Sequence, residues 1–188
     1  MSVDPAHLHL RIYPDPILRD KAQEIDEVTD EVRRVGARLV ELMHESEGIG
    51  LAAPQAGLDW RMFVAFVPPH PEDPPLEEGD PLVAMNEPQV YINPVIIAHE
   101  GDLEPYEEGC LSLPEIRGEV RRPPIIEIEA TNLEGERFRE TCAGLLARCL
   151  QHELDHLDGV LIIDRMTPMS RLKNRSRVKD LEKQAAML

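Results

Sequence analysis

The most constraining feature of this sequence is the stretch GLLARCLQHELDHLDG (144–159), where the apolar spacing changes from strand-like to helical. His152 and His156 are four residues apart, so on a helix they lie one turn apart and can direct both imidazole rings at one metal ion. Glu153 is turned by about 100° around the helix, so it can reach a metal-bound water without being a ligand. This HExxH pattern is typical of metal-dependent peptidases, and it predicts a helix with one face buried against a metal site.

The segments before this helix predict an antiparallel β structure. The apolar run MFVAFV (62–67), bounded by Pro68 and Pro69, predicts a strand, and QVYINPVIIAHE (89–100) predicts two strands broken near Asn93. The segment 123–144 alternates around turn residues at 132–135, which predicts a hairpin. Because no βαβ rhythm is present, we expect an α+β fold class, with antiparallel β-sheets packed around a C-terminal helix that carries the HExxH pattern.

Three further segments complete the expected order of elements. Residues 12–25 predict a leading loop followed by a helix start. Helical spacing predicts a helix over about 30–44, capped by Thr29 or Asp30. GIGLAAPQAG (48–57), rich in glycine and alanine, predicts a loop.

Length and composition predict one domain over residues 1–188. A proline-rich acidic segment near 68–88 is expected to be a surface insertion, since prolines exclude a helix interior and a central strand. No apolar run is long enough for a membrane helix, and no basic start is followed by an apolar stretch. We therefore expect a cytoplasmic protein without membrane contact.

The charge is strongly negative overall but unevenly distributed. A net charge of −16 argues against a whole-surface nucleic-acid binder and against specific DNA binding. No lysine or arginine occurs between Arg61 and Arg117, whereas the C-terminal tail near 165–188 is basic. That tail is either a solvated basic helix or a docking element for an anionic partner such as RNA.

Two histidines are too few for a catalytic metal, so the third ligand decides the class of enzyme. In the metzincin pattern a histidine should occupy position 162, which is isoleucine here. A thermolysin-like glutamate would have to be Glu182, which lies in the basic tail beyond Pro168. The remaining candidates are other histidines and the thiols. Among these Cys110, next to Gly109, could offer a thiolate at a tight backbone site, or it could be a small buried apolar residue.

The other two cysteines are expected to be apolar core residues. The three cysteines have no CxxC spacing, which argues against a disulfide framework. Cys142 falls in the expected hairpin, and Cys149 precedes His152 by three residues, so Cys149 is expected to line a pocket and not to bind the ion.

Three motifs in fixed order resemble the signature of bacterial-type peptide deformylases: GIGLAAPQ (48–55), EGCLS (108–112) and QHELDH (151–156). The opening IYPDPILRDKA and the closing DGVLIIDRMTPMSRLK are also similar to that family, so the likeness covers most of the chain. The resemblance implies a hydrolase that removes the N-formyl group from N-terminal formylmethionine of newly synthesised polypeptides and releases formate. It also implies Cys110 as the third metal ligand beside His152 and His156.

The resemblance assigns further roles. Glu153 would be general base and then general acid, and the Gln55 amide with the backbone N–H of Leu111 would bind the carbonyl oxygen. The family's metal is Fe²⁺, with Zn²⁺, Ni²⁺ or Co²⁺ able to replace it. The expected substrate-binding residues are Gly48, Ile49, Gly50, Glu108, Gly109, Arg117, Leu145 and Cys149.

Two positions around the site have open interpretations. Glu108 and Asp155 are candidates to orient the ligands, although Asp155 could equally be an ordinary exposed helix acid. Arg148 stands where the family often has an apolar residue at the pocket border, so it either alters substrate preference or points to solvent.

The expected partners are nascent formylmethionyl polypeptides, with ribosome contact through the basic tail. Two rival functions remain at this point: a metalloprotease that cuts internal peptide bonds, and a non-catalytic metal-binding or ribosome-associated module. Glu153 and Gln55 argue against the second, because a structural metal site needs neither.

Overall fold

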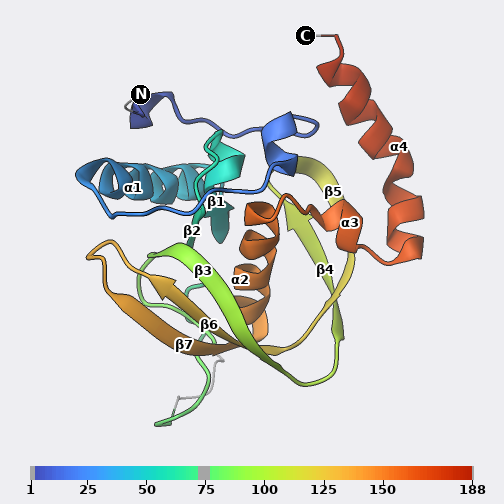
Figure 1. Ribbon diagram of the computed structural model, residues 1–188. Helices are drawn as coiled ribbons and strands as arrows, with labels where there is room; N and C mark the ends of the chain where they lie inside the picture. Colours follow the sequence, from blue (N-terminus) through green and yellow to red (C-terminus); the bar gives the residue numbers. More distant parts are fainter. Residues whose placement is uncertain (1–2, 72–76, 188) are drawn as a thin grey trace.

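The computed structural model describes residues 3–71 and 77–187 as a five-stranded sheet, a two-stranded sheet and three main helices (Figure 1). The larger sheet has the order β1-β2-β3-β6-β7, and β4 pairs with β5 in the smaller one. The paired strands are antiparallel throughout both sheets. The strands are β1 (Gly50–Ala52), β2 (Met62–Ala65), β3 (Gln89–Glu100), β4 (Glu104–Cys110), β5 (Leu113–Arg122), β6 (Ile125–Thr131) and β7 (Arg137–Ala143).

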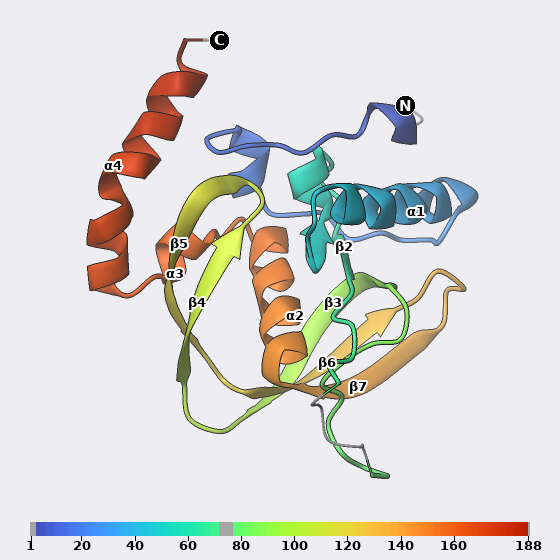
Figure 2. The same cartoon turned by 180° about the vertical axis from the view of Figure 1, so that it is seen from behind.

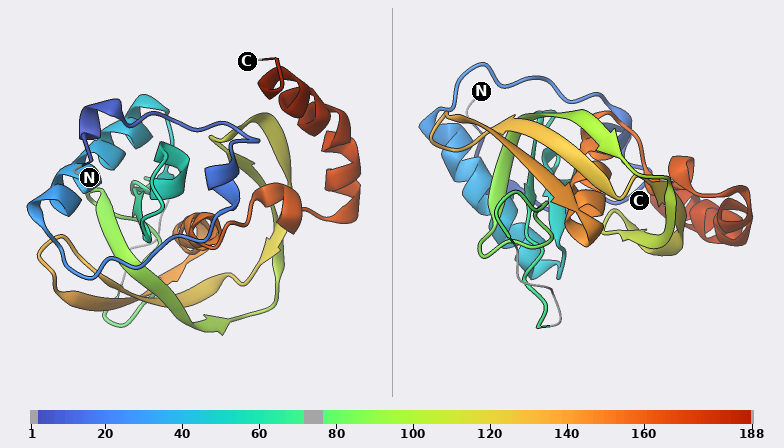
Figure 3. Two further views of the ribbon diagram at one scale, coloured as in Figure 1. Left: turned by 45° about the horizontal axis from the view of Figure 1, so that its top comes forward. Right: turned by 90° about the horizontal axis from the view of Figure 1, so that it is seen from below.

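Helix α2 (Gly144–Leu157) lies between the two sheets, and the left panel of Figure 3 shows it nearly end-on inside the curve of the strands. Its apolar side chains Leu146, Leu150 and Leu157 join Phe63 and Ile128 of the larger sheet in one buried cluster. Burying such side chains contributes about 1.5–3 kcal/mol each. The face of α2 turned away from this cluster is thereby fixed toward β4 and β5.

The other helices cover the outside of the sheets. Helix α1 (Asp30–Glu45) buries Val35 and Leu39 against β1 and β2. Helix α4 (Pro168–Ala185) lies along β5, at the end of the molecule opposite α1 (Figure 2). The short helices are η1 (Pro5–His7), η2 (Pro16–Arg19), η3 (Ala53–Ala56) and α3 (Ile162–Arg165). Within the described residues no helix is both long and apolar enough to cross a membrane.

The α+β class is confirmed, and so are its principal elements. The HExxH helix is α2, and β6 and β7 form the expected hairpin. Thr29 caps α1, since its side chain accepts a hydrogen bond from the backbone N–H of Val32. Helix α2 is nevertheless not the last element, because α3 and α4 follow it.

Several local expectations were wrong. Residues 89–100 form the single strand β3, in which a register shift absorbs the disturbance at Asn93 (φ 50°). The Asn93 amide bonds both the N–H and the carbonyl of Ile25, which compensates for the interrupted ladder. The helix start expected within 12–25 is only η2, because Pro14 and Pro16 restrict the backbone and Ala22 donates its N–H to Leu157 instead.

The structure gives further detail in two other stretches. The loop expected at 48–57 contains β1 and η3. In the acidic segment near 68–88, residues 72–76 lie outside the described residues. Its later part is anchored, because Leu82 exchanges backbone hydrogen bonds with Thr141 and Ala143 and the Met85 side chain is buried.

Candidate active site

Three side chains from two distant elements converge on one point. Helix α2 presents His152 and His156, and β4 ends at Cys110. The Cys110 Sγ atom lies 3.3 Å from His156 Nε2, and the three donor atoms all lie within 4.8 Å of one another. In the described part of the chain this is the one cluster of histidine, cysteine or acidic side chains close enough to share an ion. Two imidazoles and a thiol are suitable donors for a divalent transition metal, so the residues fit such a centre.

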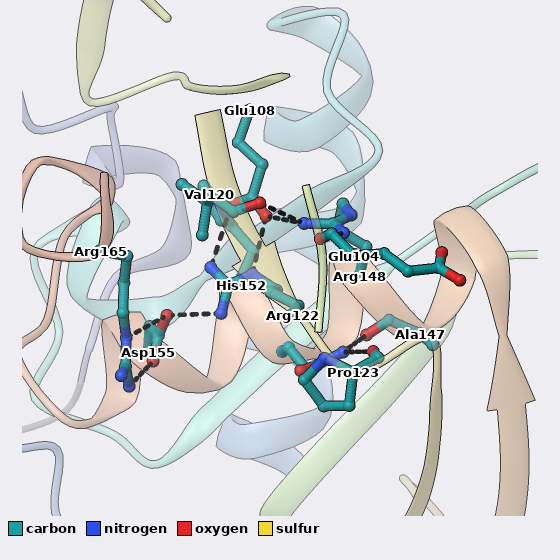
Figure 4. A network of polar contacts seen from close by, with 11 residues as sticks. Glu104, Glu108, Val120, Arg122, Pro123, Ala147, Arg148, His152, Asp155 and Arg165 are labelled. Carbon is teal, nitrogen blue, oxygen red and sulfur yellow. Dashed lines mark hydrogen bonds and ion pairs between the residues drawn. The ribbon is translucent and has the colours of Figure 1, made fainter. Parts of the chain in front are cut away.

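The second nitrogen of His152 is held by Glu108. His152 Nδ1 lies 3.1 Å from Glu108 Oε2, and Figure 4 shows this contact. A carboxylate accepts the Nδ1–H proton, which fixes the tautomer and leaves Nε2 free to bind metal. Glu108 therefore fixes the orientation of the His152 ring.

Glu108 is the centre of a buried charge network. Arg122 donates to both its oxygens at 2.7 and 3.0 Å, and also to Asp155 at 2.8 Å. Arg165 donates to both oxygens of Asp155, the shorter distance being 2.7 Å (Figure 4). Burial alone would raise the pKa of Glu108, but the bonds from His152 and Arg122 hold this pKa well below its usual range.

Asp155 is thus not an ordinary exposed helix acid. It is buried at 9% exposure and ties α2 to Arg122 and, through it, to Glu108.

Glu153 points into a confined space beside the donor cluster. It is 4% exposed, and its Oε2 atom has no hydrogen-bond partner among the described residues. Burial raises its pKa to about 7. A Cβ placed at Gly50 would overlap the Glu153 carboxylate, so glycine lets β1 approach this side chain without displacing it. A buried, unpaired carboxylate with this pKa can take up and return a proton near neutral pH.

The Gln55 side chain has a defined orientation. Its Oε1 accepts the Ala52 N–H at 2.8 Å, so Nε2 faces the other way, 3.2 Å from Ser112 Oγ and 3.6 Å from Cys110 Sγ. The amide N–H groups consequently face the side of the site where the thiol lies.

A pocket of about 580 Å³ opens beside these groups. Gln55, Cys110, Leu111, His152 and Glu153 line it. Every residue expected to bind substrate lines it as well, namely Gly48, Ile49, Gly50, Glu108, Gly109, Arg117, Leu145 and Cys149. His156 is not part of the lining and is buried at 1% exposure. Although Glu108 borders the pocket, its carboxylate is bonded to protein cations, so it serves His152 more directly than a substrate.

Burial makes the thiols of the two remaining cysteines poor metal ligands. Burial raises the pKa of Cys149 well above its ordinary value, and its Sγ lies 3.3 Å from the carbonyl of Ile49. Cys142 is fully buried in the core cluster, and burial likewise raises its pKa. Both thiols are therefore held in the neutral form, which is a poor metal ligand.

Sequence reasoning missed Arg122, Tyr106 and Ser112. Arg122 could have been found, because in the alternation of β5 it shares the buried face with Ile116 and Val120, where an arginine needs a buried acid. Tyr106 lines the pocket although it is 55% exposed, and no local pattern indicates that role.

Comparisons with known proteins agree with this geometry. The polypeptide deformylase family model matches residues 7–172. The chain is 40% identical over 179 residues to a peptide deformylase of Acinetobacter baumannii, covering 95% of this chain and 94% of that protein. It is 43% identical over 161 residues to a peptide deformylase of Desulforudis audaxviator, covering 86% and 94%.

A solved structure is also similar. The crystal structure of peptide deformylase from Ehrlichia chaffeensis superposes with a TM-score of 0.84 at 31% identity, covering 96% of this chain and 97% of that one.

Fold and site together define a metal-dependent hydrolase with an HExxH helix. Within that class, the chain belongs to the peptide deformylase family.

Proposed function

We propose that Cys110, His152 and His156 hold one divalent metal ion, with which this peptide deformylase removes the N-formyl group from newly made polypeptides. The observation that carries the proposal is the convergence of the three donor atoms beside the unpartnered carboxylate of Glu153. When bound, the ion supplies Lewis acidity that polarises a carbonyl and makes water more acidic.

Glu153 carries the proton in this scheme. The oxygen of water bonds to the formyl carbon while Glu153 accepts a proton from that water. The carbon–nitrogen bond then breaks, Glu153 returns the proton to the departing amine nitrogen, and formate leaves. The raised pKa of Glu153, about 7, suits both halves of this exchange.

Gln55 and Leu111 stabilise the charge on the carbonyl oxygen during attack. The Ala52 N–H fixes the amide of Gln55 so that Nε2 faces the site. The backbone N–H of Leu111, next to Cys110, is the second donor. Each donor of this kind is worth about 10²–10³ in rate.

The pocket accounts for recognition of an N-terminal methionine. Ile49, Leu145 and Cys149 give it apolar surface for the thioether side chain, and Gly48 and Gly50 let the loop backbone approach the substrate. Arg117 lies on the pocket rim, where it can bind the substrate backbone. We further propose that residues 1–188 act as one catalytic domain.

Formate release separates this function from the rival metalloprotease. The protein is incubated with formyl-Met-Ala and with an unblocked peptide of the same residues extended by three more. We expect formate from the first and no internal cleavage of the second. Internal cleavage without formate release would overturn the proposal, and Glu153→Gln is the matched variant that should be inactive in both assays.

The proposed resident ion is Fe²⁺. Cys110 is partly exposed at the pocket, so both thiolate and ion can meet dissolved oxygen. We expect protein prepared anaerobically with iron to be more active than aerobic protein reconstituted with zinc. Equal activity of the two preparations would contradict the assignment of iron.

We also propose that α4 contacts the ribosome, where the substrate emerges. Although the chain has a net charge of −16, this helix has six basic and two acidic residues. Lys173, Arg175 and Lys179 are exposed on it, as an RNA-facing surface requires.

Charge reversal is a better test of this contact than truncation, because Asn174 of α4 is buried against β5. The triple variant Lys173→Glu, Arg175→Glu and Lys179→Glu should lose ribosome binding in a sedimentation assay while keeping activity on formyl-Met-Ala. Arg34→Glu, an exposed reversal on α1, is the control. Unchanged ribosome affinity of the triple variant would overturn the contact.

A further inference from the structure

Arg148 lies on α2 one turn before His152, yet its side chain does not point to solvent. It is 11% exposed and it contacts both strands of the β4–β5 hairpin. Its guanidinium donates to the backbone carbonyls of Glu104 at 2.9 Å and Val120 at 3.2 Å. It also donates to the Glu108 carboxylate at 2.8 Å, as Figure 4 shows.

The hairpin depends on such contacts for its position. In the described structure β4 pairs with β5 alone, and neither strand belongs to the five-stranded sheet. Among the described residues no backbone hydrogen-bond ladder therefore joins β4 to the larger sheet on which α2 packs. Side-chain contacts set the distance between β4 and α2 instead. The planar guanidinium offers donors in fixed directions, so it can bond three acceptors at once, which a lysine ammonium on a flexible stem does less rigidly.

The same guanidinium holds an aromatic side chain at the pocket. The Arg148 Cζ atom lies 5.2 Å from the centre of the Tyr106 ring, a cation–π distance. Tyr106 on β4 lines the pocket, and Leu145 and Cys149 on α2 line it as well. Arg148 thus joins the two elements that supply these walls.

We propose that Arg148 is a positioning residue that fastens the β4–β5 hairpin to α2 and so sets the width of the pocket that selects the substrate's first side chain. The inference rests on the proposed function of that pocket. A charged residue can border this apolar pocket because the Arg148 guanidinium donates to two backbone carbonyls and to Glu108. The charge is thus satisfied by the protein and does not face the substrate's side chain.

The role differs from that of Arg122, which keeps Glu108 and therefore His152 in place. Without Arg148, Glu108 still accepts two bonds from Arg122 and lies next to His152 Nδ1. Metal binding should consequently survive the loss of Arg148, whereas pocket width should not.

The experiment compares wild type with Arg148→Met, which keeps a long side chain but removes the fork and charge. The readout is the ratio of kcat/KM for formyl-Phe-Ala-Ser to that for formyl-Met-Ala-Ser. We expect Arg148→Met to raise this ratio by about tenfold, in the range that a pocket change of one or two carbon atoms produces. Metal content should stay at the wild-type value, and amide hydrogen exchange in residues 104–110 should be faster.

Two further variants keep the test decisive. Arg121→Met removes an exposed arginine from the same hairpin and should leave the ratio and the exchange unchanged. Arg148→Lys retains the charge beside Glu108 without the planar fork, and it should also raise the ratio even if Arg148→Met fails to fold. A wild-type ratio in Arg148→Lys, or in a folded Arg148→Met, would overturn the proposal.

The measurements on wild type and on Arg148→Lys distinguish failure of the proposed function from failure of the positioning role of Arg148. If wild type releases no formate from the formyl-Met peptide, the proposed function is wrong. If wild type is active but Arg148→Lys keeps its selectivity, only the positioning role is wrong.

Discussion

Helices α2 and α4 are both rich in polar side chains, but α2 buries many of them and α4 leaves most of them exposed. Nine of the fourteen residues of α2 are buried, among them Gln151, Glu153 and Asp155. In the eighteen residues of α4 the buried set consists of Asn174. A charged or polar residue is thus not a sign of exposure in this chain; the position of its partner decides.

The partners explain the contrast. On α2, Asp155 is bonded to Arg122 and Arg165, and Gln151 donates to the carbonyls of Ala147 and Pro123. On α4, Asn174 donates to the carbonyl of Arg117, and most other residues of the helix are exposed. Breaking a buried ion pair costs several kcal/mol, while exposed pairs contribute little, so the two helices should respond to substitution very differently.

The largest effect on stability is expected at Asp155. Asp155→Ala leaves Arg122 and Arg165 without one of their acceptors, and we expect the free energy of unfolding to fall by about 3 kcal/mol. Urea unfolding measures this loss. Asp158→Ala, at the end of the same helix, removes a carboxylate that is 45% exposed where it pairs with Arg61, and it should cost less than Asp155→Ala because water can replace this acceptor. Equal losses in the two variants would mean that the network is not buried as described.

Gly50 tests how closely β1 must approach α2. In Gly50→Ala the new methyl group would overlap the Glu153 carboxylate and displace it. We expect kcat to fall by about 10²-fold, the usual cost of misplacing a reacting group by about an ångström. The melting temperature should change little, since a side-chain end can shift. Wild-type kcat would show that Glu153 needs no such space.

Asn174 tests the one buried position of α4. Asn174→Ala removes hydrogen bonds to the carbonyls of Arg117 (2.7 Å) and Ser170 (2.9 Å), and we expect a loss of about 1–2 kcal/mol in unfolding free energy. Ser176→Ala, exposed two residues later, is the control for helix propensity. A loss no greater than that of the control would indicate that α4 is not fastened to β5 through this amide.

The smallest effect is expected on the exposed face of α4. Lys179→Ala should change the unfolding free energy by no more than about 0.5 kcal/mol, as for most surface substitutions. Activity on formyl-Met-Ala should equal that of wild type. A larger loss of stability would mean that this face contacts the rest of the protein.

The sequence predicted what depends on local spacing. The HExxH helix, the β6–β7 hairpin and the cap at Thr29 all follow from residues within one element. The third metal ligand could not be predicted in this way, because Cys110 is far from His152 in the sequence and only the fold brings the two together. Spacing alone therefore left the role of Cys110 undecided. The family resemblance, carried by EGCLS, supplied that assignment.

The charge network around Glu108 could not be predicted from local sequence patterns for the same reason. Glu108 meets Arg122, Arg148 and His152 across 14, 40 and 44 residues of sequence. Strand β4 was also missed, because four successive exposed residues from Glu104 to Glu107 leave no apolar alternation to detect. Pairing with β5 and bonds from Arg148 form this strand, and both are tertiary contacts.

The most direct test of the metal site compares Cys110→Ser with Glu153→Gln, measuring bound metal per protein and formate release from formyl-Met-Ala. If Cys110 is a ligand and Glu153 only carries a proton, Cys110→Ser should lose most of its metal and all measurable activity. Glu153→Gln should keep a full equivalent of metal while activity falls by at least about 10²-fold. Full metal occupancy in Cys110→Ser, or near wild-type formate release by Glu153→Gln, would contradict the account.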